Sequence, residues 1–156
     1  MHRLLLTLAL TAMLGSLLSS TPTVAQFVPP AKKAVRVEIT RGPTLELARE
    51  HFAIIRWTTN NPGGTEVHFG VVHYGTEPTD LSQMAKSPIQ LNRGHPETTF
   101  RVHMPGLKPQ TTYYYTVTST ESNGQSDGVE SPVHQFTTPS PGERIVAYPP
   151  QPARPK

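Results

Sequence analysis

The segment 107–117, with the sequence LKPQTTYYYTV, constrains the fold of this chain more than any other. Proline and polar residues at its start are typical of a turn. Tyr113, Tyr115 and Val117 then alternate with polar or outward positions, so they share one face of a β-strand. The segment therefore predicts a turn that opens onto the penultimate strand of a β-sandwich, with Tyr113 and Tyr115 in the core.

The same two-residue alternation recurs from residue 34 to residue 138, in short runs separated by glycine, proline and asparagine. We expect seven strands, near residues 35–47, 53–58, 66–75, 81–91, 100–104, 112–118 and 133–138. Ala53, Ile55 and Trp57 alternate in the second, which places Trp57 in the core. No run has helical periodicity. The pattern predicts an all-β fold, a seven-stranded antiparallel sandwich of the immunoglobulin-like type.

Two strands carry local irregularities. The first contains Pro43, and we expect it to shift there from one sheet edge towards the other. The third has Val67, Phe69 and Val71 in one parity but Val72 in the other. A β-bulge at Gly70 would keep both sets usable, because one extra residue flips the faces beyond it.

The two ends of the chain differ from the middle. Residues 1–25 have an apolar run without charge from residue 4 to residue 18, then small and polar residues, which is typical of a secretory signal peptide cut after Ala25. We expect residues 26–33 to form a linker, residues 34–138 the sandwich, and residues 139–156 a proline-rich disordered tail. The predicted location is secreted or periplasmic, without membrane insertion after the signal is removed.

Composition excludes several functions. The chain has no cysteine, which rules out disulfides, thiolate metal sites and cysteine nucleophiles. Its net charge of +3 falls to +2 without Arg3, and its acids and bases are interleaved. Nucleic-acid binding favours clustered basic residues, and only Lys32 and Lys33 are adjacent. We therefore expect no nucleic-acid partner.

No reacting group is placed by a recognisable motif. A serine hydrolase would need an exposed nucleophile on a strained turn, and no Gly-x-Ser-x-Gly occurs. His68 and His73 should lie on opposite faces of a regular strand, whereas a bulge at Gly70 would bring them to the same face. No bracketing carboxylate or third histidine at clear spacing accompanies them, and the other histidines that remain after signal removal are scattered: His51, His95, His103 and His134. We expect no catalytic residue, no metal and no cofactor.

Three loops are the candidate binding surface: residues 60–65, 92–97 and 121–128. In an immunoglobulin-like strand order they gather at one end of the sandwich, where binding loops of related folds lie. The candidate side chains are Asn60, Asn61, Arg93, His95, Asn123 and Asp127. The alternative is that turns simply need such residues.

Taken together, Ala53-x-Ile55-x-Trp57, the Tyr74-Gly75 pair and the string from Leu107 to Val117 resemble the fibronectin type III family. This resemblance implies that the Tyr113 hydroxyl bonds backbone near Leu107 or Lys108. Segments 39–43 (ITRGP) and 72–76 (VHYGT) look more like the N-terminal domain of purple acid phosphatases. In that family the metals lie on a separate catalytic domain, so the resemblance implies a non-catalytic domain.

Three functions stay open on the sequence. The first is an exported, monomeric, non-catalytic module that binds a protein or cell-envelope component of unknown identity. The second is an accessory or remnant N-terminal domain of a purple acid phosphatase-like metallophosphoesterase, acting beside a separate catalytic domain. The third is a spacer without a ligand. Fold motifs of this kind do not distinguish among them.

Overall fold

The computed structural model describes residues 32–146, which form nine strands and no helix. The strands are β1 (Ile39–Arg49), β2 (Phe52–Asn60), β3 (Val67–Gly75), β4 (Gln83–Gln90), β5 (Glu97–Pro105), β6 (Thr112–Glu121), β7 (Ser126–Glu130), β8 (His134–Thr137) and β9 (Arg144–Val146). The predicted signal peptide and its cleavage point lie outside the described residues. Residues 32–146 contain no helix that is long and apolar enough to cross a membrane.

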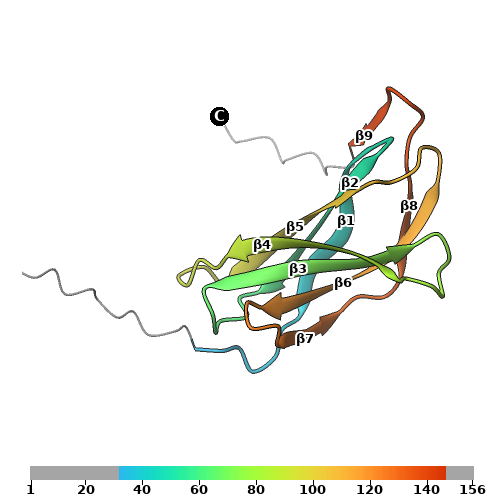
Figure 1. The fold of residues 1–156 in the computed structure, drawn as a ribbon. Coiled ribbons are helices and arrows are strands. Elements are labelled where there is room, and N and C mark those ends of the chain that lie inside the picture. The colour runs from blue at the N-terminus through green and yellow to red at the C-terminus, as the bar shows by residue number, and fades with distance from the viewer. Residues whose placement is uncertain (1–31, 147–156) are drawn as a thin grey trace, which may run out of the picture.

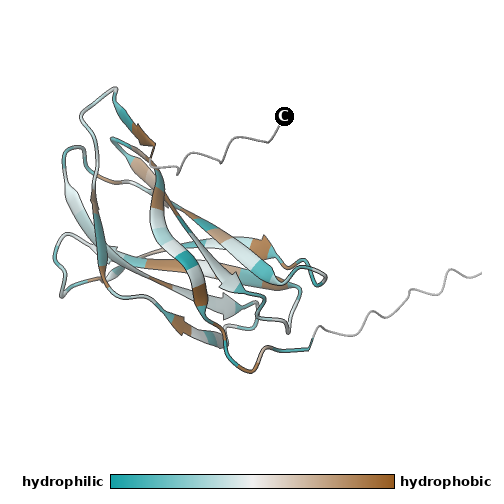
Figure 2. Ribbon diagram, turned by 180° about the vertical axis from the view of Figure 1, so that it is seen from behind, coloured by the Kyte–Doolittle hydropathy of each residue, from teal (hydrophilic) through white to brown (hydrophobic). Residues whose placement is uncertain are grey.

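Two antiparallel sheets make the sandwich (Figure 1). One has the order β5-β2-β1-β9; the other has the order β4-β3-β6-β7, with β8 also paired to β6. Hydrophobic and hydrophilic residues alternate along the strands (Figure 2), as expected for sheets with one buried face each. The prediction of an all-β sandwich is confirmed.

The core lies between the sheets and is centred on aromatic rings. Trp57 is 1% exposed and stacks on Phe100, with ring centroids 5.2 Å apart. Tyr113 and Tyr115 are also buried and pack against Phe136 at centroid distances of 5.9 Å. The predicted core positions of Trp57, Tyr113 and Tyr115 are confirmed.

The predicted bond of Tyr113 is also present. Its hydroxyl accepts a hydrogen bond of 2.9 Å from the backbone N–H of Lys108. This bond ties the turn at the start of β6 to the ring that the strand buries.

Tyr113→Phe is expected to lower the free energy of unfolding by about 0.5–1.5 kcal/mol, because it removes this one bond and leaves the ring in place. Tyr114→Phe is the matched control, since Tyr114 lies on the opposite face of β6 and is only half-buried. Urea unfolding of both variants checks the facing of the strand. Equal effects would contradict it.

The structure corrects three of the strand predictions. β1 begins at Ile39 rather than Val35, passes through Pro43 without leaving its sheet, and pairs with β2 along its length with three register shifts. Residues 126–130, predicted as loop, form β7. Residues 144–146, predicted as disordered tail, form β9 against β1. Composition hides β9 because its β-branched residues follow a proline-rich stretch and gain order only by pairing.

The bulge predicted at Gly70 is wrong. β3 pairs with β4 and β6 in unbroken register, and Gly70 faces the core. A Cβ on Gly70 would lie 2.9 Å from Cη2 of Trp57 and 2.9 Å from Cγ2 of Val102. The glycine is there because core side chains press against the backbone of β3, not because the strand changes face.

Candidate interaction site at the loop end

The structure brings the three predicted loops together at one end of the sandwich. The side-chain amide of Asn61 donates to the backbone carbonyls of Asn92 at 2.9 Å and His95 at 2.7 Å, and its oxygen accepts from the N–H of Gly63. The carboxylate of Glu121 lies against Gly64, where a Cβ would be 3.1 Å from Oε2. One asparagine and one glutamate therefore join all three loops.

The N-terminal part of the described chain closes over this end. The N–H of Ala34 donates to the carbonyl of Pro62 at 2.8 Å. Gly63 has a φ of +64°, and a Cβ there would be 2.0 Å from the carbonyl oxygen of Lys32. Only glycine fits at this crossing. The predicted linker 26–33 is thus too long at its end: Lys32 and Lys33 belong to the packed domain.

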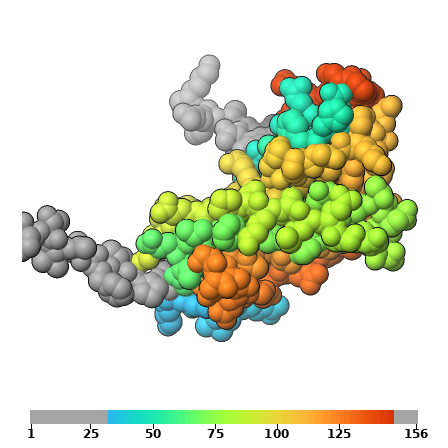
Figure 3. All heavy atoms as spheres, viewed as in Figure 1, coloured from blue at the N-terminus to red at the C-terminus, as the bar shows by residue number. Residues whose placement is uncertain are grey.

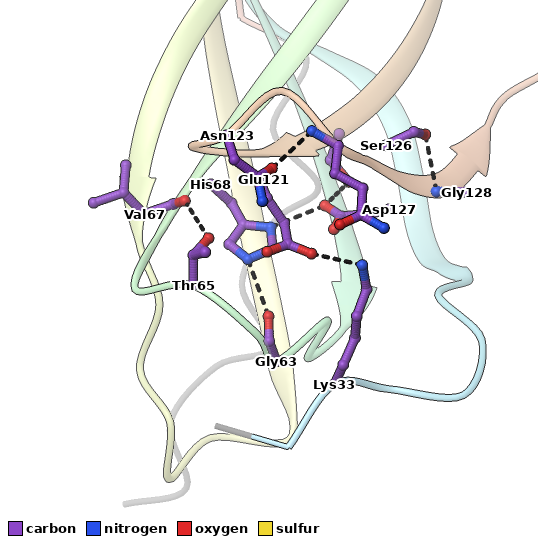
Figure 4. A network of polar contacts seen from close by, with 12 residues as sticks. Lys33, Gly63, Thr65, Val67, His68, Glu121, Asn123, Ser126, Asp127 and Gly128 are labelled. Carbon is purple, nitrogen blue, oxygen red and sulfur yellow. Dashed lines mark hydrogen bonds and ion pairs between the residues drawn. The ribbon is translucent and has the colours of Figure 1, made fainter. Parts of the chain in front are cut away.

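A charged network lies beneath this cover (Figure 4). His68 of β3 is 0% exposed; its Nδ1 lies 2.9 Å from Oδ2 of Asp127 and its Nε2 lies 3.0 Å from the carbonyl oxygen of Gly63. The hydroxyl of Ser119 donates to the same carboxylate oxygen at 2.7 Å. Both partners of the imidazole are acceptors, so both ring nitrogens donate and His68 is an imidazolium.

Electrostatics agrees with this protonation state. Burial lowers the pKa of His68, but the hydrogen bond and charge of Asp127, the carbonyl of Gly63 and the charge of Glu121 outweigh it, so the pKa is raised. The pKa of Glu121 is shifted in the opposite direction. The hydrogen bond from Lys33, 2.5 Å long, outweighs burial and lowers the pKa of the Glu121 carboxyl.

The Ser119, His68 and Asp127 side chains are not a catalytic triad. In a triad the serine hydroxyl bonds the imidazole, and the nucleophile reaches a substrate. Here Ser119 bonds the aspartate instead, and all three residues are buried. The described residues contain no group of three or more His, Cys, Asp or Glu side chains that could hold a metal ion. This network can hold loops in place, but it cannot present a reacting atom.

The candidate side chains at this end are mostly engaged within the protein. Asn60 donates to the carbonyl of Arg36 and accepts from the N–H of Glu38, and Asn61 bridges loops as described. Arg93 forms an ion pair of 2.8 Å with Glu66. His95 lies exposed, with Nδ1 3.0 Å from the carbonyl of Glu97, while Asn123 accepts from the N–H of Gln125.

Asp127, which the sequence predicts as a candidate side chain of the third binding loop, is not available to a partner. It lies on β7 with its side chain fully buried against His68. Sequence reasoning missed the network members Lys33, Ser119 and Glu121 and considered His68 only as a metal ligand. Alternation could have identified them, because it places His68 on the inward face of one strand and Ser119 and Glu121 on the inward face of another. The structure pairs these two strands, β3 and β6.

These features define a fibronectin type III-like β-sandwich domain whose loop end is locked by a buried ion pair. The model of the family "Purple acid Phosphatase, N-terminal domain" matches residues 41–138. The chain belongs to this family, whose domain is the non-catalytic one, as the sequence resemblance implied.

Among solved structures, the chain is similar to the sensor domain of the anti-sigma factor RsgI4 of Pseudobacteroides cellulosolvens. The longer form of that domain is 18% identical, with 72% of this chain and 98% of that chain covered and a TM-score of 0.47. Its solution structure is 18% identical, with 79% and 92% covered and a TM-score of 0.48. None of the curated proteins matches the chain significantly.

Proposed function

We propose that the chain is an exported, non-catalytic β-sandwich module that binds a protein or cell-envelope component through its loop end. One observation carries the proposal: three loops and the N-terminal segment are joined into a single surface by Asn61, Glu121 and Lys33. A surface that is ordered before binding loses less conformational entropy when a partner arrives.

The exposed side chains of the loop end are mostly polar, and they would fit a polar surface on the partner. Its exposed residues include Glu66, Asn92, His95 and the residues 122–126. Short polar side chains and glycine provide hydrogen-bond donors and acceptors that adapt to a partner. Acids and bases are mixed here, which favours a protein or glycan surface over a polyanion.

The proposal includes export of the chain and a monomeric state. The predicted signal peptide at residues 1–25 directs the chain to a periplasm or outside the cell, and the absence of cysteine leaves the fold independent of oxidation there. The core needs no partner to be buried, since its aromatic rings are covered by the two sheets of one chain. We expect a monomer that works by surface complementarity.

Family membership favours a second candidate. A chain of this family could act as an accessory to a metallophosphoesterase catalytic domain carried by another polypeptide. The binding surface would be the same, and the partner would be that enzyme. A phosphatase recovered with the chain would select this candidate.

Affinity capture with the immobilised chain 26–156 against envelope and soluble fractions of its own cell tests both candidates. The double variant Arg93→Ala, His95→Ala is expected to lose a specific partner. Arg101→Ala, His103→Ala is a closely matched control, because it also removes an Arg–Glu ion pair and an exposed histidine, but from the middle of β5. Equal recovery by both variants would move the site away from the loops, and recovery of no partner by the unmodified chain would favour a spacer.

A further inference from the structure

His68 is enclosed between segments that come from distant parts of the chain. Its Nδ1 lies 2.9 Å from Oδ2 of Asp127 on β7, and its Nε2 lies 3.0 Å from the carbonyl oxygen of Gly63 in the loop after β2. Its strand neighbours are Glu121 of β6 and the apolar Ile89 of β4. The side chain is 0% exposed, so water reaches the ring only when one of these segments moves.

The proton on His68 decides whether both of its bonds can exist. A carboxylate oxygen and a carbonyl oxygen accept but do not donate, so each must face an N–H group. A neutral imidazole has one N–H, and its other nitrogen would present a lone pair to an acceptor. The single N–H is expected to stay with the charged Asp127, because charge-assisted bonds are the stronger ones. Loss of the proton therefore breaks the bond to Gly63.

Gly63 is the point where residues 32–34, here called the N-terminal cover, cross the loop. The carbonyl of Pro62 accepts a hydrogen bond of 2.8 Å from the N–H of Ala34. The contact at Gly63 itself is so close that a Cβ would lie 2.0 Å from the carbonyl oxygen of Lys32. Figure 3 shows the N-terminal residues, in blue, beside the orange residues of the β6–β7 turn at this end of the molecule. A movement of the Gly63 carbonyl therefore displaces the N-terminal cover.

The same movement reaches a second loop. The N–H of Gly63 donates to Oδ1 of Asn61 at 3.0 Å, and the amide of Asn61 donates to two carbonyls of the loop 92–97. The bond from His68 to Gly63 thus supports one loop directly and another through a single side chain.

The charges around His68 favour its protonated form. Burial lowers the pKa of His68, but Asp127, the Gly63 carbonyl and Glu121 outweigh burial and raise it. The hydrogen bond from Lys33 of the N-terminal cover lowers the pKa of Glu121, so this carboxylate stays ionised near neutral pH. His68 is the member of this network whose ordinary titration range lies there. The closed arrangement holds the proton more tightly than an open one, in which water would replace these partners.

We propose that protonation of His68 closes the loop end, and that loss of this proton releases the loop 60–65 together with the N-terminal cover. The inference rests on the function proposed above and adds a regulation to it. The binding surface is ordered in the protonated form and loosened in the neutral form. A partner that fits the ordered surface is bound more tightly at lower pH, because less conformational entropy is lost when it binds.

Amide hydrogen exchange, measured by NMR on the chain 26–156 at pH 6 and pH 8, tests the proposal. No partner is needed, so its failure is distinguishable from a failure of the proposed function. Each rate is divided by the intrinsic rate at the same pH. Protection of the Ala34 and Gly63 amides is expected to fall at least about tenfold at the higher pH, which corresponds to the loss of one hydrogen bond to a charged group. Amides of β2 and β5 should stay better protected than these two at both pH values, because the release is local.

His68→Gln is the matched control. Its amide can donate to the Gly63 carbonyl but does not titrate, so protection of Ala34 and Gly63 should be the same at both pH values. An equal fall in both proteins, no fall in the unmodified chain, or a loss of protection shared by all strands would each overturn the proposal. If the variant does not fold, the ring of His68 gives a second readout in the unmodified chain. Its NMR titration must have the same midpoint as the loss of protection, and separate midpoints would overturn the proposal.

Discussion

Asp127→Ala is expected to lower the free energy of unfolding by about 3–5 kcal/mol near pH 6, one of the two largest effects that we expect in this chain. The substitution leaves the His68 imidazolium fully buried without its counter-ion, and it removes the acceptor of the Ser119 hydroxyl. Urea unfolding at fixed temperature measures the effect.

The loss should depend on pH in a defined direction. The native pKa of His68 is raised above the ordinary 6.5, so the native state holds the proton more tightly than the unfolded chain. The stabilisation from this proton is complete below 6.5 and disappears as the pH rises through the native pKa. The difference between the unmodified chain and Asp127→Ala should therefore shrink from pH 6 to pH 9.

A double variant separates charge from packing. His68→Leu together with Asp127→Ala removes both charges and should recover at least half of the loss near pH 6, because no unpaired ion stays buried. A difference that is the same at both pH values would show that His68 is neutral in the native state. Glu121 and Lys33 are left in place throughout, since their ion pair contributes to the same region.

Trp57→Ala is expected to cost about 3–5 kcal/mol, since it empties the centre of the core. The ring is 1% exposed and lies between Phe100 and the backbone of Gly70. Its Nε1 has no hydrogen-bond partner among the described residues, so the loss is one of packing and buried area. A change below about 1 kcal/mol would contradict the core position.

Gly70→Ala sharpens this experiment. Alone it should cost about 1–3 kcal/mol, because the added methyl overlaps Trp57 and Val102. In the Trp57→Ala background the ring is gone, and the same methyl should cost clearly less. A double-mutant cycle measures the coupling, and additive effects would show that the ring and the glycine do not press on each other.

Much of the fold follows from local pattern. The alternation in residues 53–57 and 113–117 predicted which rings are buried, because a strand with one buried face repeats every second residue. The pattern failed at Gly70, where valines of both parities are buried on the two faces of an inner strand. It also failed at β9, whose three residues are ordered by β1.

The candidate site was predicted only in its location. Loops rich in asparagine and glycine gather at one end because an antiparallel sandwich returns its chain there. Which of their side chains stay available depends on contacts between segments far apart in sequence, as in the bonds from Asn61 to residues 92 and 95. The sequence around each residue does not indicate which distant segment it will contact.

The sequence alone determined the class of fold and the core positions of Trp57, Tyr113 and Tyr115, because both depend on alternation along strands. The bond of Tyr113 to the backbone of Lys108 was implied by the family resemblance. Only the tertiary structure decided which charged side chains pair with each other. It placed Asp127 inside, against a histidine 59 residues away, and Lys33 on Glu121, 88 residues away. The physical reason is that an ion pair stabilises a buried site only where two distant segments meet and water is excluded.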